Sequence, residues 1–166
     1  MGGETIRIAG KGFSFSITEP DGWNIDFGAA SQLANFVMHP AGTSWRKSPV
    51  VVFGRFTPRN SQETLESFQE KDAKELENAC PFYEIRDLDL DVKGLRRFLV
   101  REHSCPSVRD EIVAVTEVPG FFVTFVLSSD RRDSLQSALS PFQEMLSSFD
   151  WMSQPGPARP SQPQQH

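Results

Sequence analysis

The chain has 166 residues, of which 38% are hydrophobic and 23% are charged, and its formal net charge is −5. The length suits one domain, and the composition excludes a disordered, a collagen-like or a coiled-coil chain. No apolar run approaches the roughly 20 residues of a membrane-spanning helix. The acidic balance argues against nucleic-acid binding through phosphate neutralisation. We therefore expect a soluble globular domain.

Short strands are predicted in the first third of the chain. Apolar and small polar side chains alternate in residues 13–18, a pattern typical of a strand with one solvent-exposed face. Further strands are predicted over residues 23–27, 34–39 and 50–56. The last of these is apolar on both faces up to Gly54, which indicates a strand covered from both sides.

A helix is predicted next, with Asn60 as its N-cap because Glu63 follows at capping-box spacing, and with its end near Ala79. One side of this helix is rich in glutamate and aspartate. A solvated helix face is the preferred interpretation, and an acidic docking surface is the alternative.

Residues 83–103 are predicted to form a hairpin whose three-residue loop places Gly94 in the left-handed conformation. That register pairs Asp91 with Leu95, Leu88 with Phe98 and Asp89 with Arg97. An alternating strand spreads its aspartates along a line, so no calcium or other metal site is expected here.

A second hairpin is predicted over residues 111–128, with Pro119-Gly120 at the centre of a type II turn. A helical region over 133–149 is expected to be kinked or split near Ser140-Pro141. Residues 153–166 are rich in proline and glutamine and are expected to form a disordered tail. The predicted core includes Phe98, Val113, Val115, Phe125 and Leu127.

Two cysteines, Cys80 and Cys105, each precede a proline and form no C-x-x-C pair. Two buried, unpaired thiols are the preferred interpretation. The alternative is a disulfide at the open end of the first hairpin, which would imply an oxidising compartment. No signal peptide is present in the sequence as written, so we expect a cytoplasmic protein, or a periplasmic or secreted one if a leader was removed.

The sequence contains no motif for acyl transfer, phosphate cradling or zinc-dependent hydrolysis, so neither an enzyme nor a cofactor is expected. His103 and Cys105 are close in sequence, but a cysteine before proline near a strand end is a poor nucleophile candidate. The candidate binding residues are Trp45, Arg46 and Lys47, because they lie together in the polar loop 41–49. A tryptophan beside an arginine is a pairing enriched at interaction hot spots. The alternative is that Trp45 packs on the sheet.

The order of elements resembles the PsbP-like superfamily, which includes bacterial DcrB-like proteins. The resemblance rests on FSFSITEPDGW at 13–23, ANFVMHPAG at 34–42, and the covered strand with its capped helix at 50–79. The hairpins at 83–103 and 111–128 and a closing helix with a terminal Ser148-Phe149 complete it. It implies an α+β fold, an α/β/α sandwich with a central antiparallel sheet, formed by residues 1–152. It also implies a non-catalytic accessory module that binds another protein. A periplasmic small-ligand carrier or lipoprotein domain, an effector-type secretion chaperone and an unrecognised enzyme are the alternatives.

Overall fold

The computed structural model describes residues 3–10, 12–29, 34–94, 96–106 and 108–152, and its strands form two antiparallel sheets. The larger sheet has the order β3 (Trp23–Ile25), β4 (Phe36–Pro40), β5 (Val50–Pro58), β9 (Phe121–Ser129), β8 (Arg109–Val118), β7 (Leu99–Cys105) and β6 (Glu84–Asp87). The smaller sheet has the order β1 (Thr5–Gly10), β2 (Phe13–Thr18) and β10 (Asp150–Met152). The helices are α2 (Leu65–Ala79), α3 (Arg132–Ser137) and α4 (Leu139–Ser148).

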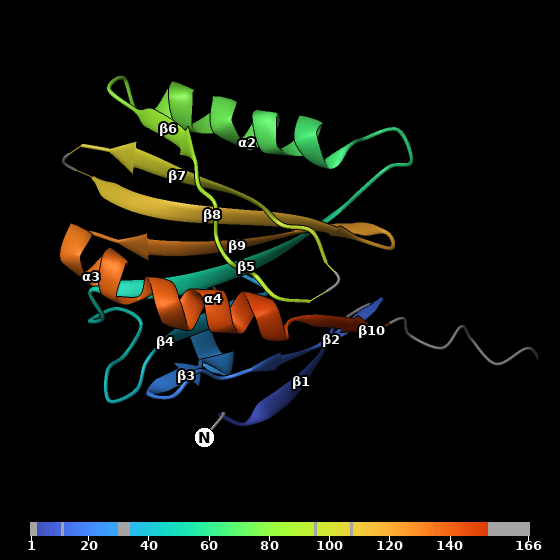
Figure 1. Ribbon diagram of the computed structural model, residues 1–166, viewed down its shortest axis with the longest axis vertical. Coiled ribbons are helices and arrows are strands. Elements are labelled where there is room, and N and C mark those ends of the chain that lie inside the picture. Colours follow the sequence, from blue (N-terminus) through green and yellow to red (C-terminus); the bar gives the residue numbers. More distant parts are fainter. Residues whose placement is uncertain (1–2, 11, 30–33, 95, 107, 153–166) are drawn as a thin grey trace, which may run out of the picture.

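The larger sheet is the central layer of the fold (Figure 1). Helix α2 lies on one face over β7 and β8, while α3, α4 and the smaller sheet cover the other face. Ile112 and Leu127 are paired across β8 and β9 and join the core under α4, whereas the adjacent Val113 joins the core under α2. Both faces of the central strands are therefore apolar, and the predicted antiparallel sheet covered by helices is confirmed.

A second sheet was not predicted. It forms because β1 pairs with the neighbouring β2, and β10, near the end of the described chain, pairs with the other edge of β2. The pairing of β10 with β2 joins segments that are far apart in the sequence, so no local pattern indicates it. The predicted strands at 13–18, 23–27, 34–39 and 50–56 correspond to β2, β3, β4 and β5.

The first predicted hairpin is wrong in its register. β6 and β7 pair Asp87 with Arg101, and among the described residues the expected pairs of Leu88 with Phe98 and of Asp89 with Arg97 are not formed. Leu95 lies outside the described residues, while Gly94 has the expected positive φ of 110°. Residues 88–94, here called the strap, leave β6 and cross in front of the central sheet to α4 (Figure 1). Leu88, Leu90 and Val92 of the strap pack against the main core, and this burial replaces the ladder hydrogen bonds.

Helix α2 begins later than predicted. Asn60 accepts hydrogen bonds from the backbone N–H groups of Gln62 and Glu63 in a preceding turn. The N-cap is Thr64, which exchanges reciprocal side-chain hydrogen bonds with Ser67 in a capping box. This start places Leu65 against the sheet.

The second hairpin has the predicted two-residue turn, because Val118 pairs with Phe121 and Gly120 has a φ of 82°. The last helical region is split as expected, but at Ala138 rather than at Ser140-Pro141. Pro141 is tolerated because it lies in the first turn of α4, where backbone N–H groups have no partner within the helix. The expected tail at 153–166 lies outside the described residues.

The predicted core is largely confirmed. Phe125 and Leu127 are fully buried in the main cluster, and Val113 and Val115 are buried under α2. Phe98 is only partly buried, at the edge of the main cluster.

Candidate interaction surface

Loop 41–49 connects β4 to β5 at one end of the central sheet. The carbonyl of Ser44 accepts hydrogen bonds from the backbone N–H groups of Lys47 and Ser48, at 3.1 and 2.9 Å. The hydroxyl of Thr43 donates to the carbonyl of Pro40 at 2.8 Å. The loop is therefore held by its own short-range hydrogen bonds.

Trp45 is half-buried in this loop and packs against a small cluster that contains Ala29, Val37 and Val51. The guanidinium of Arg46 lies over the Trp45 ring, 5.1 Å from its centroid. Arg46 and Lys47 are exposed. Of the predicted binding residues, the two basic ones therefore lie at the surface, while Trp45 mainly anchors the loop.

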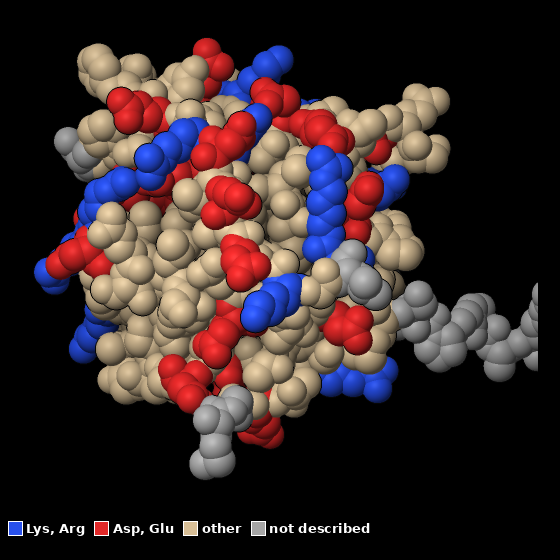
Figure 2. Space-filling model, in the orientation of Figure 1, with Lys and Arg blue, Asp and Glu red and all other residues tan. Residues whose placement is uncertain are grey.

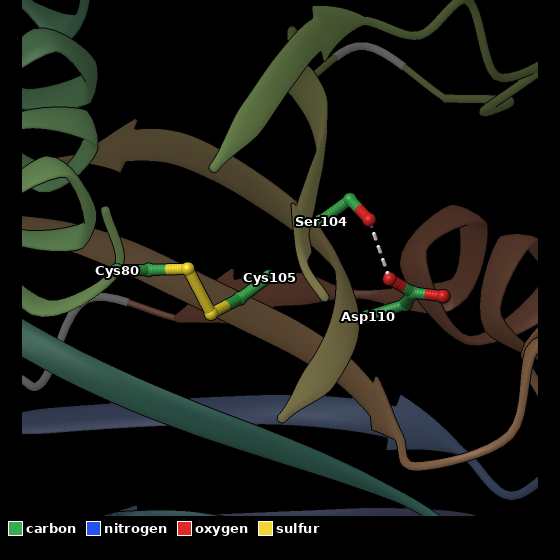
Figure 3. Close-up of a disulfide and its surroundings, with 4 residues drawn as sticks. All are labelled: Cys80, Ser104, Cys105 and Asp110. Carbon is green, nitrogen blue, oxygen red and sulfur yellow. Dashed lines mark hydrogen bonds between the residues drawn. A yellow bond between two sulfur atoms is a disulfide. The ribbon is translucent and has the colours of Figure 1, made fainter. Parts of the chain in front are cut away.

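A disulfide joins Cys80 and Cys105, which differs from the preferred expectation of two unpaired thiols (Figure 3). Cys80 is the C-cap of α2, and its backbone N–H donates to the carbonyl of Leu76 at 2.9 Å. Cys105 is the last residue of β7. The bridge therefore fixes the end of α2 to the sheet. With Cys105 in this bridge, it cannot act as a thiolate nucleophile beside His103.

The two loops that follow these cysteines expose an apolar surface, here called the apolar tip: Pro81, Phe82, Pro106 and Val108. Phe82 is 79% exposed and Val108 is 66% exposed. Phe27 is the other large hydrophobic side chain that the described part of the chain exposes. The disulfide and the prolines restrict the backbone where each loop begins, at Cys80-Pro81 and Cys105-Pro106.

Sequence reasoning missed the apolar tip, although a signal was present. Each cysteine begins the same short pattern of cysteine, proline and a hydrophobic residue within two further positions. Hydrophobic residues in turns beside a disulfide have little core available to bury them, so the pattern indicates exposure.

The apolar tip and loop 41–49 lie at the same end of the central sheet. The pairing registers establish this, because Val50 is paired with Ser129 and Ser129 with Asp110, beside the β7–β8 turn. Adjacent strands are about 4.8 Å apart, so the two surfaces are separated by roughly four strand spacings. Loop 41–49 and the apolar tip both lie on the left in Figure 1.

A polar network lies beside the disulfide, on the opposite face of the sheet. The buried carboxylate of Glu102 is bound by Arg86 from β6, with Nε–Oε2 at 2.9 Å, and by Arg132 from α3, with Nη2–Oε1 at 2.8 Å. Ser104 donates to Asp110 at 2.7 Å (Figure 3). Burial acts to raise the pKa of Glu102, but the hydrogen bonds from Arg86 and Arg132 outweigh it and hold the pKa below its usual value.

A second set of ionisable groups lies on the α2 side of the sheet. Burial raises the pKa of Glu111 on β8, and the nearby carboxylate of Asp72 on α2 adds to this effect. Ser128 on β9 donates to Glu111 at 3.3 Å. Burial lowers the pKa of His103, which is paired with Glu111 across β7 and β8. The hydroxyl of Ser128 thus faces a carboxyl group rather than the imidazole.

Two of the five carboxylates of helix α2 form ion pairs, whereas Asp72, Glu75 and Glu77 have no ion pair within the described part of the chain. Glu66 is paired with Arg97 at 2.9 Å, and Glu70 is paired with Arg101 at 2.7 Å. Figure 2 shows acidic and basic side chains interspersed over the face that carries the strap and α4. Surface charge therefore does not mark a docking area on this face.

Within the described ranges, no group of three or more His, Cys, Asp and Glu side chains is arranged to hold a metal ion. The helices of these ranges are all too short or too polar to cross a membrane.

No protein-family model and no curated protein matches this sequence. The structure is similar to the solution structure of cyanobacterial PsbP (CyanoP) from Synechocystis sp. PCC 6803, with a TM-score of 0.56 and 18% sequence identity. The match covers 88% of this chain and 91% of that chain, so it extends over most of the fold rather than over one motif. The chain therefore has a PsbP-like fold.

Proposed function

We propose that this chain is a non-catalytic accessory domain that binds another protein through the apolar tip. The observation that carries the proposal is the exposure of Phe82 and Val108 on two loops that one disulfide ties together. Exposed large hydrophobic side chains, aromatic ones above all, supply much of the binding energy at protein interfaces. The PsbP-like fold is consistent with this role.

Loop 41–49 supplies the second part of the proposed interface. A standard interface buries about 800 Å² on each partner, which is wide enough to span from the apolar tip to Arg46 and Lys47. In this arrangement Phe82 is the buried centre, and the two basic residues form a polar rim that affects the association rate more than the affinity. Trp45 holds the loop in place.

A protein partner is favoured over a lipid surface. A single myristoyl chain gives only marginal membrane binding. Phe82 and Val108 together would bury less apolar area in a membrane than such a chain, so they would bind it more weakly. The net charge of −5 also opposes attraction to anionic lipids.

The experiment places a photo-crosslinking amino acid at Phe82 and, as a control, at exposed Ser61 at the other end of the sheet. We expect one defined partner protein from position 82 and not from position 61. Purified partner should then bind the wild type and fail to bind the double variant Phe82→Ser, Val108→Ser. Equal binding by the double variant, with unchanged stability, would contradict the proposal.

We also propose that the protein works in an oxidising compartment, because structural disulfides persist there and are rare in a reducing cytosol. The test is alkylation of rapidly quenched cell extracts with a maleimide of high mass. A gel shift only after reduction is the expected result. A shift without reduction would show unpaired thiols and favour the cytoplasm.

A further inference from the structure

A groove of about 570 Å³ lies at the end of the sheet opposite the apolar tip. β8 begins beside the tip at Arg109 and ends beside the groove. Its apolar lining residues, Leu65 of α2 and Phe149, are buried and offer little surface, and its charged ones are Arg96, Arg97, Glu117 and Asp150. The volume is within the roughly 300–1,000 Å³ range of small-molecule sites.

The charges at this groove are not equally compensated. Arg97 is paired with Glu66 at 2.9 Å, and Glu117 is paired with Arg59. Arg96 has no carboxylate within ion-pair distance among the described residues, which include every aspartate and glutamate of the chain. Its charge is therefore not neutralised by a salt bridge.

Arg96 is nevertheless held in position. Its guanidinium lies over the ring of Phe149, 5.7 Å from the centroid, and its Nη1 donates to the carbonyl of Glu117 at 3.2 Å. A guanidinium has five N–H donors, and a carboxylate accepts two of them in parallel. A carboxylate that binds Arg96 therefore contacts a guanidinium that is already held in place, so little side-chain conformational entropy is lost on binding.

We propose that this groove binds a small organic carboxylate. The carboxylate pairs with the remaining N–H groups of Arg96, and the rest of the molecule occupies the remainder of the groove. The carboxylates of Glu117 and Asp150 at the same groove disfavour a dianion such as phosphate. This site is separate from the proposed protein interface.

The test is a titration of the full-length protein, followed by NMR, with hexanoate, hexanamide and inorganic phosphate. Hexanoate is expected to shift the Arg96 side-chain N–H and the amides of the groove in a saturable way. Hexanamide should bind about tenfold more weakly or worse, because it lacks the charge-assisted hydrogen bonds.

Two variants locate the site. Arg96→Gln should weaken hexanoate binding about tenfold or more, whereas Arg109→Gln removes the same charge at the other end of β8 and should have no effect. If the NMR spectrum of Arg96→Gln shows that the variant is not folded, the proposal is tested on the wild type alone, by comparing the affinities of hexanoate and hexanamide. The proposal is overturned if hexanoate gives no saturable shift, if folded Arg96→Gln binds as the wild type does, or if phosphate binds at the groove as tightly. A Phe82→Ser variant should keep hexanoate binding, which separates this test from that of the protein interface.

Discussion

Gly54 on β5 is paired with Phe125 on β9, and a Cβ placed on Gly54 would lie 3.1 Å from the Phe125 ring and 2.8 Å from the Cβ of Phe36. The missing side chain at position 54 therefore makes room for two aromatic rings that contact each other edge to face. This close approach is what allows three strands to share one aromatic core.

Gly54→Ala is expected to destabilise the protein by about 1–3 kcal/mol, the usual cost of overpacking a core. The measurement is the midpoint of urea unfolding. Gly28→Ala is the matched control, because its Cβ would meet only the Asp26 side chain, at the ordinary van der Waals distance of 3.6 Å. Equal midpoints for Gly54→Ala and the wild type would contradict the steric argument.

The fold was predictable from the sequence where a short local pattern decides the structure. The hairpin of β8 and β9 follows from its apolar strands and from Pro119-Gly120. The strap was not predictable in this way, because its alternating leucines and aspartates satisfy a strand and a segment lying across the core equally well. The position of Leu88 against the main core depends on the shape of the sheet beneath it, which no local pattern encodes.

The candidate surface was less predictable than the fold. Loop 41–49 was identified from its composition, but whether Trp45 points outward depends on the cluster that contains Val37 and Val51. The sequence does not decide between two unpaired thiols and a disulfide, because the hairpin register does not determine whether Cys80 and Cys105 are bonded. Cys80 lies at the end of a helix, so its position follows from the packing of α2 on the sheet.

The half-buried Glu111 on β8 predicts an unusual pH dependence of stability. Its folded-state pKa is raised above the ordinary value of 4.5 by burial. Its contribution to stability is therefore fully present below the unfolded-state pKa, and it is lost as the pH rises through the folded-state pKa. Glu111→Gln keeps an acceptor for Ser128 and removes the ionisation. We expect this variant to gain stability relative to the wild type as the pH is raised from 5 to 8.

Urea midpoints at several pH values test this expectation. Glu117→Gln is the control, since this exposed side chain is also on β8. If Glu111→Gln and the wild type differ by the same amount at pH 5 and pH 8, the assignment of the raised pKa is wrong.

Glu102 should make stability depend on pH in the opposite direction from Glu111. Arg86 and Arg132 hold its pKa below the ordinary value, so its contribution is present above the unfolded-state pKa and is lost as the pH falls through the folded-state pKa. Glu102→Gln leaves two guanidinium groups without their shared carboxylate and should cost roughly 1–3 kcal/mol at pH 7. The difference from the wild type should shrink as the pH falls below 4, and a constant difference in acid unfolding would contradict the assignment.

The disulfide should stabilise the protein by about 3 kcal/mol, since it closes a loop between residues separated by 25 positions. The double variant Cys80→Ser, Cys105→Ser should show this loss in urea unfolding. Hydrogen exchange should increase first in the C-terminal turn of α2, which the bridge fixes to β7. Reduction of the wild type should reproduce the effect of the double variant, while a reductant should not change the variant. A stability loss that reductant does not mimic would show that the substitutions act through packing instead.

Trp45 provides a test that separates packing from binding. Truncating a fully buried tryptophan lowers the free energy of unfolding by about 3–5 kcal/mol. Because Trp45 is half-buried, Trp45→Ala should lower it by roughly half of that amount. Lys47→Ala is the matched control in the same loop, because its exposed side chain should change stability by no more than about 0.5 kcal/mol. If Trp45 mainly anchors the loop, Trp45→Phe should recover most of the lost stability and keep partner binding.

Unfolding midpoints of these variants, measured beside the affinity for the crosslinked partner, distinguish the two roles. A Trp45→Ala variant that is as stable as the wild type but no longer binds the partner would show that Trp45 is a contact residue.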